Sequence, residues 1–298
     1  MHKDTTPDYD VARMMGVAKF QAFQRSKTAH ASQEELTAKV VTPPIDTFQN
    51  MSVGALAGKV ALITGASKGI GKATALRLAQ DGASIVINYA SDSASANELV
   101  KKIGANRAIA VQADAGSVGG IETMVNATVK HFGKIDILIP NAGILPMKDL
   151  KNTSESDFDN IVKLNIKGPY FLVQKALPHM AAGSHIVLVS TTLTQASTVM
   201  PGYLLYNTTK GAIEQMVRVM SKDLMRQGIN VNAVAPGPTG TELFYQGKNE
   251  QMLKMIAGFS PANRIGTPEE IADVVSFLSG EGSRWVSGQV VRANGGMA

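Results

Sequence analysis

From Lys59 to the C-terminus, short apolar runs alternate with longer segments whose apolar residues recur at helical spacing. The runs are apolar at successive positions, which is typical of strands covered on both faces of a sheet. This repetition predicts an α/β fold, a single Rossmann-type doubly wound parallel sheet of about seven strands flanked by helices. Strands are expected over residues 60–63, 84–88, 108–111, 135–139, 186–189, 230–234 and 289–291, and helices over 70–80, 118–132, 158–177, 204–225 and 268–278.

Residues 1–58 lack this pattern and are expected to form an N-terminal extension, or arm, ahead of one folded domain over residues 59–298. A short helix over residues 11–23 and an extended connector over residues 40–58 are expected. Arg13, Lys19 and Arg25 would suit a mitochondrial presequence, but such presequences are poor in acid and this segment carries Asp4, Asp8 and Asp10. A cytoplasmic location is therefore expected.

Composition and charge argue against several classes of function. The net charge is +5, but the basic residues are scattered and aromatic residues make up only 5%, which does not favour a nucleic acid partner. No apolar run approaches the ~18 residues of a membrane span. The chain has no Cys, and its His residues lack the spacing of metal ligands, so neither thiol chemistry nor a metal site is expected. The positive charge suits an anionic cofactor or substrate.

A glycine-rich loop, TGASKGIG, joins the first expected strand to the first expected helix. Gly65 would let the chain turn sharply, Gly69 would let backbone N–H groups approach a pyrophosphate, and Gly71 would let the helix pack closely on the strand. The helix N-terminus would add a partial positive charge. The loop predicts a dinucleotide site, although its spacing differs from the general Gly-x-Gly-x-x-Gly pattern. The expected contacts are Gly65, Ser67, Lys68, Gly69, Ile70 and Gly71.

A tyrosine and a lysine lie four residues apart in YNTTK, so they share a face of the expected helix. The Lys210 ammonium would favour the phenolate of Tyr206 and lower its pKa from about 10 toward working pH. Such a tyrosine could act as a general acid, although a Tyr-x₃-Lys pair by itself is also common on helices.

Five motifs in order make residues 59–298 resemble the short-chain dehydrogenase/reductase family: TGASKGIG, Asn141-Ala142-Gly143, Asn165 within LNIKG, Tyr206-x₃-Lys210 and Pro236-Gly237. The resemblance implies that residues 59–298 are a catalytic domain and that Lys210 also holds the nicotinamide ribose. It implies that Asn165 supports a water leading to Lys210. Further cofactor contacts implied by it are Asn141, Ala142, Gly143, Tyr206, Pro236, Gly237, Thr241 and the adenine-contacting Asp114.

The fourth catalytic residue of the family is usually a serine closing the fifth strand, and this chain reads Ser190-Thr191-Thr192 there. Aligning the strand places Thr191 on the serine position. Its hydroxyl offers the same donor and acceptors, although the extra methyl restricts χ1. Thr191 is expected to orient the substrate carbonyl, with Ser190 and Thr192 as alternatives.

The end of the second strand bears on the choice of nicotinamide cofactor. An acid about 20 residues past the glycines would bind the ribose 2′-hydroxyl and repel a 2′-phosphate, and none occurs before Asp92. Lys68 could reach the phosphate, and Asn88 and Ser91 offer uncharged hydrogen bonds. In the resembling family a basic residue in this loop accompanies NADPH, so NADPH is expected rather than NADH.

A substrate lid is expected over residues 242–263, whose apolar side chains favour an apolar or aromatic carbonyl substrate. The main expectation is an NADPH-dependent reductase of an aldehyde or ketone, most similar to aldehyde reductase-like members. The alternatives are a biosynthetic ketoreductase acting on a 3-oxoacyl or polyketide substrate, and a non-catalytic NADP(H)-binding regulator. The resemblance also implies a homotetramer or homodimer assembled through the helices expected over 158–177 and 204–225.

Overall fold

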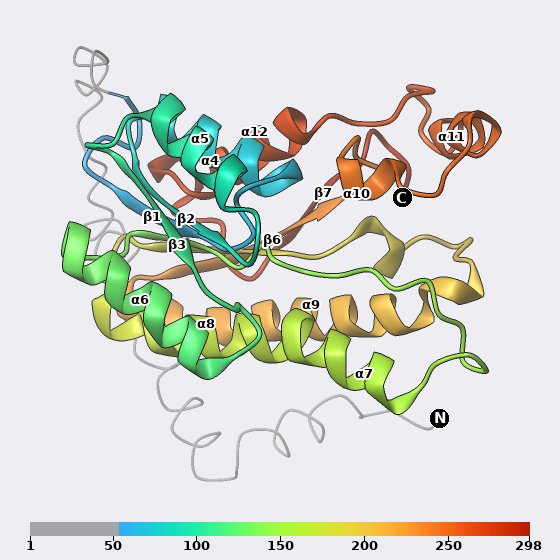
Figure 1. Ribbon diagram of the computed structural model, residues 1–298, viewed down its shortest axis with the longest axis horizontal. Helices are drawn as coiled ribbons and strands as arrows, with labels where there is room; N and C mark the ends of the chain where they lie inside the picture. The colour runs from blue at the N-terminus through green and yellow to red at the C-terminus, as the bar shows by residue number, and fades with distance from the viewer. Residues whose placement is uncertain (1–53) are drawn as a thin grey trace, which may run out of the picture. The chain divides into compact units, whose positions relative to one another are not determined.

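The computed structural model describes residues 54–298, and the helix expected over residues 11–23 lies outside them, as does most of the expected arm. A seven-stranded parallel sheet in the order β3-β2-β1-β4-β5-β6-β7 runs through the centre of the domain (Figure 1). This confirms the doubly wound α/β fold. The strands are β1 (Val60–Ile63), β2 (Ser84–Tyr89), β3 (Ala108–Gln112), β4 (Ile137–Ile139), β5 (His185–Val189), β6 (Asn230–Pro236) and β7 (Val290–Ala293).

Helices cover both faces of the sheet. One face carries α4 (Gly69–Gln80), α5 (Ser93–Ile103) and α12 (Pro268–Leu278), and the other carries α6 (Val118–Phe132), α8 (Gly168–Ala176) and α9 (Leu204–Leu224) (Figure 1). Among the described residues, no helix combines the length and apolarity needed to cross a bilayer.

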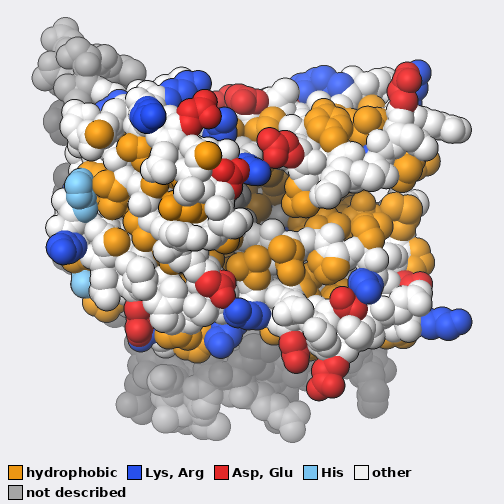
Figure 2. Space-filling model, viewed as in Figure 1, with side chains coloured by type: hydrophobic (Ala, Val, Ile, Leu, Met, Phe, Trp, Pro, Cys, Tyr) orange, Lys and Arg blue, Asp and Glu red, His pale blue; other side chains and the backbone are white. Residues whose placement is uncertain are grey.

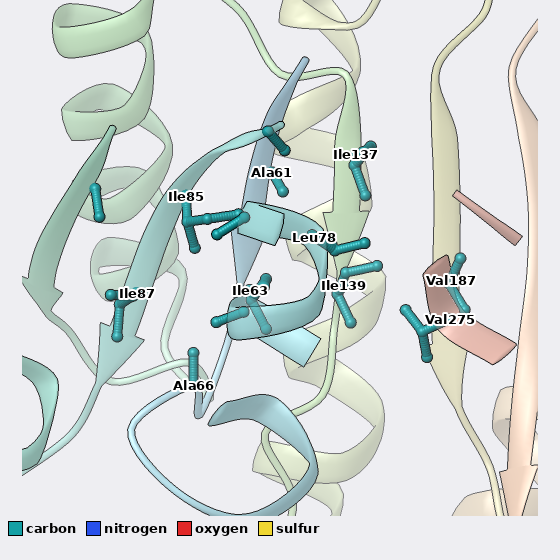
Figure 3. Close-up of a cluster of buried hydrophobic side chains, with 14 of the residues drawn as sticks. Ala61, Ile63, Ala66, Leu78, Ile85, Ile87, Ile137, Ile139, Val187 and Val275 are labelled. Atoms are coloured by element: carbon teal, nitrogen blue, oxygen red, sulfur yellow. The ribbon is translucent and has the colours of Figure 1, made fainter. Parts of the chain in front are cut away.

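The two faces explain why the strands are apolar at every position. Ala61 and Ile63 of β1 point into the core under α4 and α12, where Leu78 and Val275 join them (Figure 3). Leu62, between them, points into the opposite core under α6, α8 and α9. Successive side chains of a strand point to opposite faces of the sheet. Because both faces are covered by helices, every position of the strand is buried and apolar.

The helix expected over residues 158–177 is interrupted. It consists of α7 (Glu155–Val162), a π-helical turn at Lys163–Lys167 and α8, and it ends in a short 3₁₀ turn at Leu177–His179. The N–H of Gly168 bonds the carbonyl of Lys163, five residues back, which is the wider π spacing. Such bulges occur frequently at functional sites, and Asn165 lies in this one.

The domain begins ahead of Lys59. Leu56 is buried, and its N–H donates to the carbonyl of Asp81 at 2.7 Å. Gly54 approaches the same carbonyl so closely that a Cβ there would lie 2.3 Å from it. These residues of the expected connector therefore pack on the domain that follows them.

Candidate active site

The carboxyl ends of β1 and β4 lie side by side at the point where the strand order reverses. In open α/β sheets, ligands bind at this switch point. A cavity of about 930 Å³ opens beside it and is bounded by the segments after β5 and β6 and by the lid. Figure 2 shows hydrophobic side chains gathered around the hollow in this face of the domain.

The glycine loop after β1 has the shape that a bound phosphate needs. Gly65 and Gly69 have φ of +61° and +53°, which side chains with a Cβ rarely adopt. A Cβ on Gly71 would lie 2.4 Å from the carbonyl oxygen of Gly65. Helix α4 begins at Gly69 with no side-chain cap and no acid in its first turn. Its unpaired N–H groups and dipole therefore fit the pyrophosphate of a dinucleotide.

Two asparagines hold this loop in place. The Asn141 amide donates to the carbonyls of Thr64 and Gly65 at 2.9 and 3.2 Å, which ties β4 to the loop. Asn88 accepts from the Gly65 N–H at 3.3 Å and donates to the carbonyl of Ala113 at 3.0 Å. Because Asn88 is 1% exposed, its side chain supports the loop, and the expectation that it offers a hydrogen bond to the cofactor is not met in this arrangement.

Charged groups gather where the expected 2′-phosphate would lie. The Lys68 ammonium pairs with Asp92 at 2.8 Å and approaches Glu242 at 3.7 Å. Ser91 is exposed beside Asp92. Sequence reasoning gave no role to Asp92 or Glu242.

Asp114, at the end of β3, lies in a tight turn. Its carboxylate accepts from the Gly116 N–H at 2.8 Å and pairs with Lys163 at 2.8 Å. The hydrogen bond from Lys163 is the main cause that lowers the pKa of Asp114. About half of the side chain remains exposed, so it can also face an adenine.

Asn165 connects the loop after β4 to α9. Its side-chain oxygen accepts from the Ile144 N–H at 3.0 Å, and its amide donates to the Ile144 carbonyl at 3.0 Å and to the Thr209 hydroxyl at 3.1 Å. Thr209 is the neighbour of Lys210. A Cβ on Gly143 would lie 3.2 Å from the Asn165 oxygen and 3.8 Å from the Lys210 ammonium. The structure therefore brings Gly143, Asn165 and Lys210 together, as the motifs predict.

Tyr206 and Lys210 share a face of α9, but the net shift of the phenol pKa is upward. The Lys210 ammonium lies 5.6 Å from the centre of the Tyr206 ring and donates to the carbonyl of Val189 at 2.8 Å. Burial in the apolar cavity raises the pKa of Tyr206 to about 12, and a hydrogen bond with Thr191 only partly offsets this. Burial lowers the pKa of Lys210 to about 8. The expected direction for the tyrosine was wrong because desolvation by burial is the largest cause of the shift, and the phenol is protonated at neutral pH.

The three hydroxyls that follow β5 differ in what they contact. Ser190 donates to the Glu214 carboxylate at 2.8 Å, and Thr192 donates to the carbonyl of Ala235 at 3.2 Å. Thr191 is the one of the three whose side chain affects the pKa of the Tyr206 phenol. This arrangement supports Thr191 as the residue that orients the substrate carbonyl.

Replacing Thr191 by Ala is expected to lower kcat by about 10²-fold, the usual cost of removing one hydrogen-bond donor to a developing oxyanion. Thr191→Ser should retain most of the activity because the hydroxyl stays. The measurement is steady-state reduction kinetics of T191A and T191S beside S190A and T192A. Near-full kcat in T191A, with a large loss in S190A or T192A, would move the role to the neighbour.

The segment after β6 forms one wall of the cavity. Pro236, Gly237 and Thr241 all line it, and Thr241 also caps α10 (Glu242–Tyr245) by accepting from the Phe244 N–H at 3.1 Å. The expected lid contains α10 and α11 (Glu250–Ala257), separated by a turn. Apolar lining comes from Leu145, Met147, Val199, Met200, Tyr203, Leu243, Phe244, Met255, Ile256, Phe259 and Met297.

Two residues near the cavity were missed by sequence reasoning. Lys248 is the single charged side chain among the described residues that line the cavity, and it lies over the Phe244 ring at 4.7 Å. Glu214 accepts from Ser190 and from Thr194 at 2.6 Å, so it holds both ends of the turn that carries Thr191. Glu214 lies one helical turn beyond Lys210, and this spacing could have indicated from the sequence that Glu214 faces the site.

Within residues 54–298, no group of three or more His, Asp or Glu residues is placed to share a metal ion.

Residues 65–298 match the family described as enoyl-(acyl carrier protein) reductase. The chain is 40% identical over 254 residues to versicolorin reductase 1 of Aspergillus parasiticus, covering 81% of this chain and 97% of that protein. It is 37% identical over 255 residues to a chloroplastic NADPH-dependent aldehyde reductase-like protein of Arabidopsis thaliana, covering 81% and 94% of the two chains.

A solved structure agrees with these relatives. The crystal structure of the angucycline C-6 ketoreductase LanV with bound NADP superposes with a TM-score of 0.76 at 35% identity, covering 82% of this chain and 97% of that one. Together with the glycine loop and the Tyr206–Lys210 pair, these matches establish that the chain belongs to the short-chain dehydrogenase/reductase family.

Proposed function

We propose that this protein is an NADPH-dependent reductase that converts a carbonyl group of an aldehyde or ketone to an alcohol. One observation carries this proposal: Tyr206 and Thr191 line the same largely apolar cavity beside the glycine loop, and the Thr191 side chain is near enough to the phenol to affect its pKa. A carbonyl oxygen placed between the two hydroxyls would receive a hydrogen bond from each. When bound, NADPH supplies the hydride that adds to the carbonyl carbon.

Each side chain has a distinct part in the proton transfer. Tyr206, whose pKa of about 12 keeps it protonated at neutral pH, donates its proton to the carbonyl oxygen. Thr191 orients that oxygen and stabilises its developing negative charge. The buried Lys210 ammonium lies over the tyrosine ring and stabilises the phenolate that forms. Asn165 holds the adjoining turn of α9 through Thr209.

The cofactor is NADPH. The uncapped N-terminus of α4 suits the pyrophosphate, and Lys68 in the adjoining glycine loop is the cation proposed to bind the 2′-phosphate. Several relatives are named for NADPH dependence or were solved with NADP bound. Ser67 and Ile70 in the loop, with Asn141, Ala142 and Gly143 after β4, complete the proposed cofactor contacts.

The substrate that fits best is apolar or aromatic. The cavity lining is rich in methionine, phenylalanine and tyrosine, and flexible methionines pack well against flat rings. A biosynthetic ketoreductase of polyketide-like aromatic compounds is the second candidate. It is favoured by the similarity to versicolorin reductase 1 and to an angucycline ketoreductase. The intact Asn165, Tyr206 and Lys210 speak against a regulator that has lost catalysis.

The proposed function is tested by following NADPH oxidation with aldehydes, quinones, aromatic ketones, hydroxynaphthalenones and acetoacetyl thioesters. We expect kcat/KM to be highest for the aromatic carbonyl compounds, and kcat/KM with NADPH to exceed that with NADH. Reduction of acetoacetyl thioesters alone would indicate a 3-oxoacyl substrate. No turnover with any compound, despite tight NADPH binding, would favour the regulator.

We also propose a homotetramer or homodimer in the cytoplasm. Large side chains are exposed along the helices on one face of the sheet, namely Phe158 on α7, Tyr170 on α8 and Val219 on α9, each about half exposed. Apolar residues exposed on neighbouring helices mark an association surface where they form a continuous patch. Light scattering of the purified protein distinguishes a tetramer or dimer from a monomer.

A further inference from the structure

The lid brings one cation to the wall of the substrate cavity. Lys248 follows α10 and lines the cavity together with Phe244, Met255 and Phe259. No other charged side chain belongs to the lining within the described part of the chain. Because the surrounding walls are largely apolar, the ammonium would attract a ligand anion more strongly here than it would in bulk water.

Contacts within the lid fix the position of the Lys248 side chain. The ammonium donates to the carbonyl of Phe244 at 2.6 Å and lies 4.7 Å from the centre of the Phe244 ring. The backbone N–H of Lys248 donates to the carbonyl of Tyr245 at 3.1 Å. An ammonium has three donors, and the Phe244 carbonyl takes one of them. The remaining two can bind a ligand without any rearrangement of the lid.

Lys248 differs from two nearby lysines in having no carboxylate partner. Lys68 pairs with Asp92 at 2.8 Å, and Lys254 on α11 pairs with Glu250 at 2.7 Å. None of the salt bridges among residues 54–298 includes Lys248. A charge beside an apolar cavity is stabilised when an opposite charge joins it. A bound anion would supply the counter-ion that these residues do not.

The anionic groups of the cofactor have other partners in the proposed function. The N-terminus of α4 binds the pyrophosphate, and Lys68 binds the 2′-phosphate. Lys248 is therefore left for the substrate. The cavity, at about 930 Å³, lies near the upper end of the range for drug-sized ligands, and Tyr206 and Thr191 line it as well. One compound can then contact the two hydroxyls and the ammonium together.

We propose that Lys248 is a specificity-determining residue that binds an anionic oxygen of the substrate, either a carboxylate or an acidic phenol. This inference rests on the proposed function and narrows its substrate class to aromatic carbonyl compounds that carry such an oxygen away from the reacting carbonyl. The carbonyl oxygen lies with Tyr206 and Thr191, the rings pack on the apolar lining, and the anion pairs with Lys248. This charge-assisted hydrogen bond also fixes which end of the compound faces the tyrosine.

The test compares matched substrates that differ only in charge, 6-formyl-2-naphthoate and its methyl ester, reduced with saturating NADPH. The readout is the ratio of kcat/KM for the acid to kcat/KM for the ester, in which any general loss of activity cancels. We expect Lys248→Met to lower this ratio by about 10-fold, as for the loss of one hydrogen bond between charged groups. Lys248→Arg keeps the charge and should retain most of the preference. In the wild type the ratio should fall as salt is added.

A second pair of substrates distinguishes the two kinds of anion. The pair is 6-hydroxy-2-naphthaldehyde and its methyl ether, compared at a pH at which the phenol is ionised. A fall of the ratio in K248M for either pair supports the inference, and the pair that responds identifies the group. If the wild type reduces both pairs slowly, 2-naphthoate and methyl 2-naphthoate are compared as inhibitors of the best carbonyl substrate. The ratio of their inhibition constants should then change by the same factor in K248M.

Lys254 provides the matched control. It carries the same charge on the same lid, but its side chain is 77% exposed, pairs with Glu250 and does not line the cavity. Lys254→Met should therefore leave the acid-to-ester ratio within about twofold, because solvent and salt screen a charge that the substrate does not contact. Lys248→Gln repeats the test if K248M is unstable.

The possible outcomes separate this inference from the proposed function. An unchanged ratio in K248M for every pair, or an equal fall in K254M, would overturn the role of Lys248 while carbonyl reduction by the wild type left the proposed function standing. The same holds if K248M instead weakens NADPH binding, measured by calorimetric titration, because the ammonium would then serve the cofactor. A wild type that reduces no carbonyl compound would overturn the proposed function, and this inference with it.

Discussion

Replacing Tyr206 by Phe should lower kcat for carbonyl reduction by about 10³-fold and leave the dissociation constant for NADPH within about twofold. The substitution removes only the hydroxyl, so the ring still fills its part of the cavity and still lies under the Lys210 ammonium. The expected loss follows from removing the one hydroxyl that is proposed to donate the proton to the carbonyl oxygen. Thr191 can still donate a hydrogen bond to the carbonyl oxygen, but its alcohol cannot give up a proton near neutral pH.

This comparison separates catalysis from regulation. Steady-state kinetics with the best carbonyl substrate and calorimetric titration with NADPH are both required. Tyr203, which also lines the cavity and whose pKa burial raises, offers a matched control. Tyr203→Phe should retain kcat within about tenfold because it removes a phenol that is not the proton donor. Equal losses in the two variants, or full activity in Y206F, would contradict the assigned role.

Much of the fold is local in origin and could be predicted. Each expected strand overlaps an observed one and differs from it by at most two residues at either end, because burial on both faces leaves a continuous apolar run. The helices over Val118–Phe132 and Pro268–Leu278 have the expected bounds. The π turn around Asn165 was not predictable from apolar periodicity, because a single extra residue in one turn leaves the pattern on either side intact.

The candidate site, like the fold, has parts that could be predicted from local sequence and parts that could not. The glycine loop and the Tyr206–Lys210 pair are short motifs whose residues act close to one another in sequence. The sequence suggested that the Asn88 side chain is free to bind the cofactor, yet it already accepts a hydrogen bond from the Gly65 N–H and donates one to the Ala113 carbonyl. Those partners lie on other segments, so the sequence around Asn88 gives no sign of them. The raised pKa of Tyr206 has the same origin, since the burial that causes it depends on how separate segments enclose the cavity.

Replacing Lys210 is the second substitution expected to have a large effect on kcat, because the side chain acts through its charge as well as its shape. Its ammonium is buried, and burial lowers its pKa to about 8. A lysine with a lowered pKa is charged below that value and neutral above it. In the proposed function, this charge stabilises the phenolate that Tyr206 forms when it gives up its proton. The kcat for reduction should therefore be level below pH 8 and fall as the pH rises through about 8.

Lys210→Met should lower kcat by about 10³-fold, because the phenolate would then form in an apolar cavity without a cation. The residual activity should lose the decline near pH 8, and NADPH should bind more weakly because the family resemblance implies that Lys210 also holds the nicotinamide ribose. Lys222→Met is the matched control, since Lys222 lies exposed on the same helix, and it should keep both rate and profile. A K210M enzyme that retains the decline would assign the titration near pH 8 to another group, and one that retains kcat would show that the phenolate needs no cation.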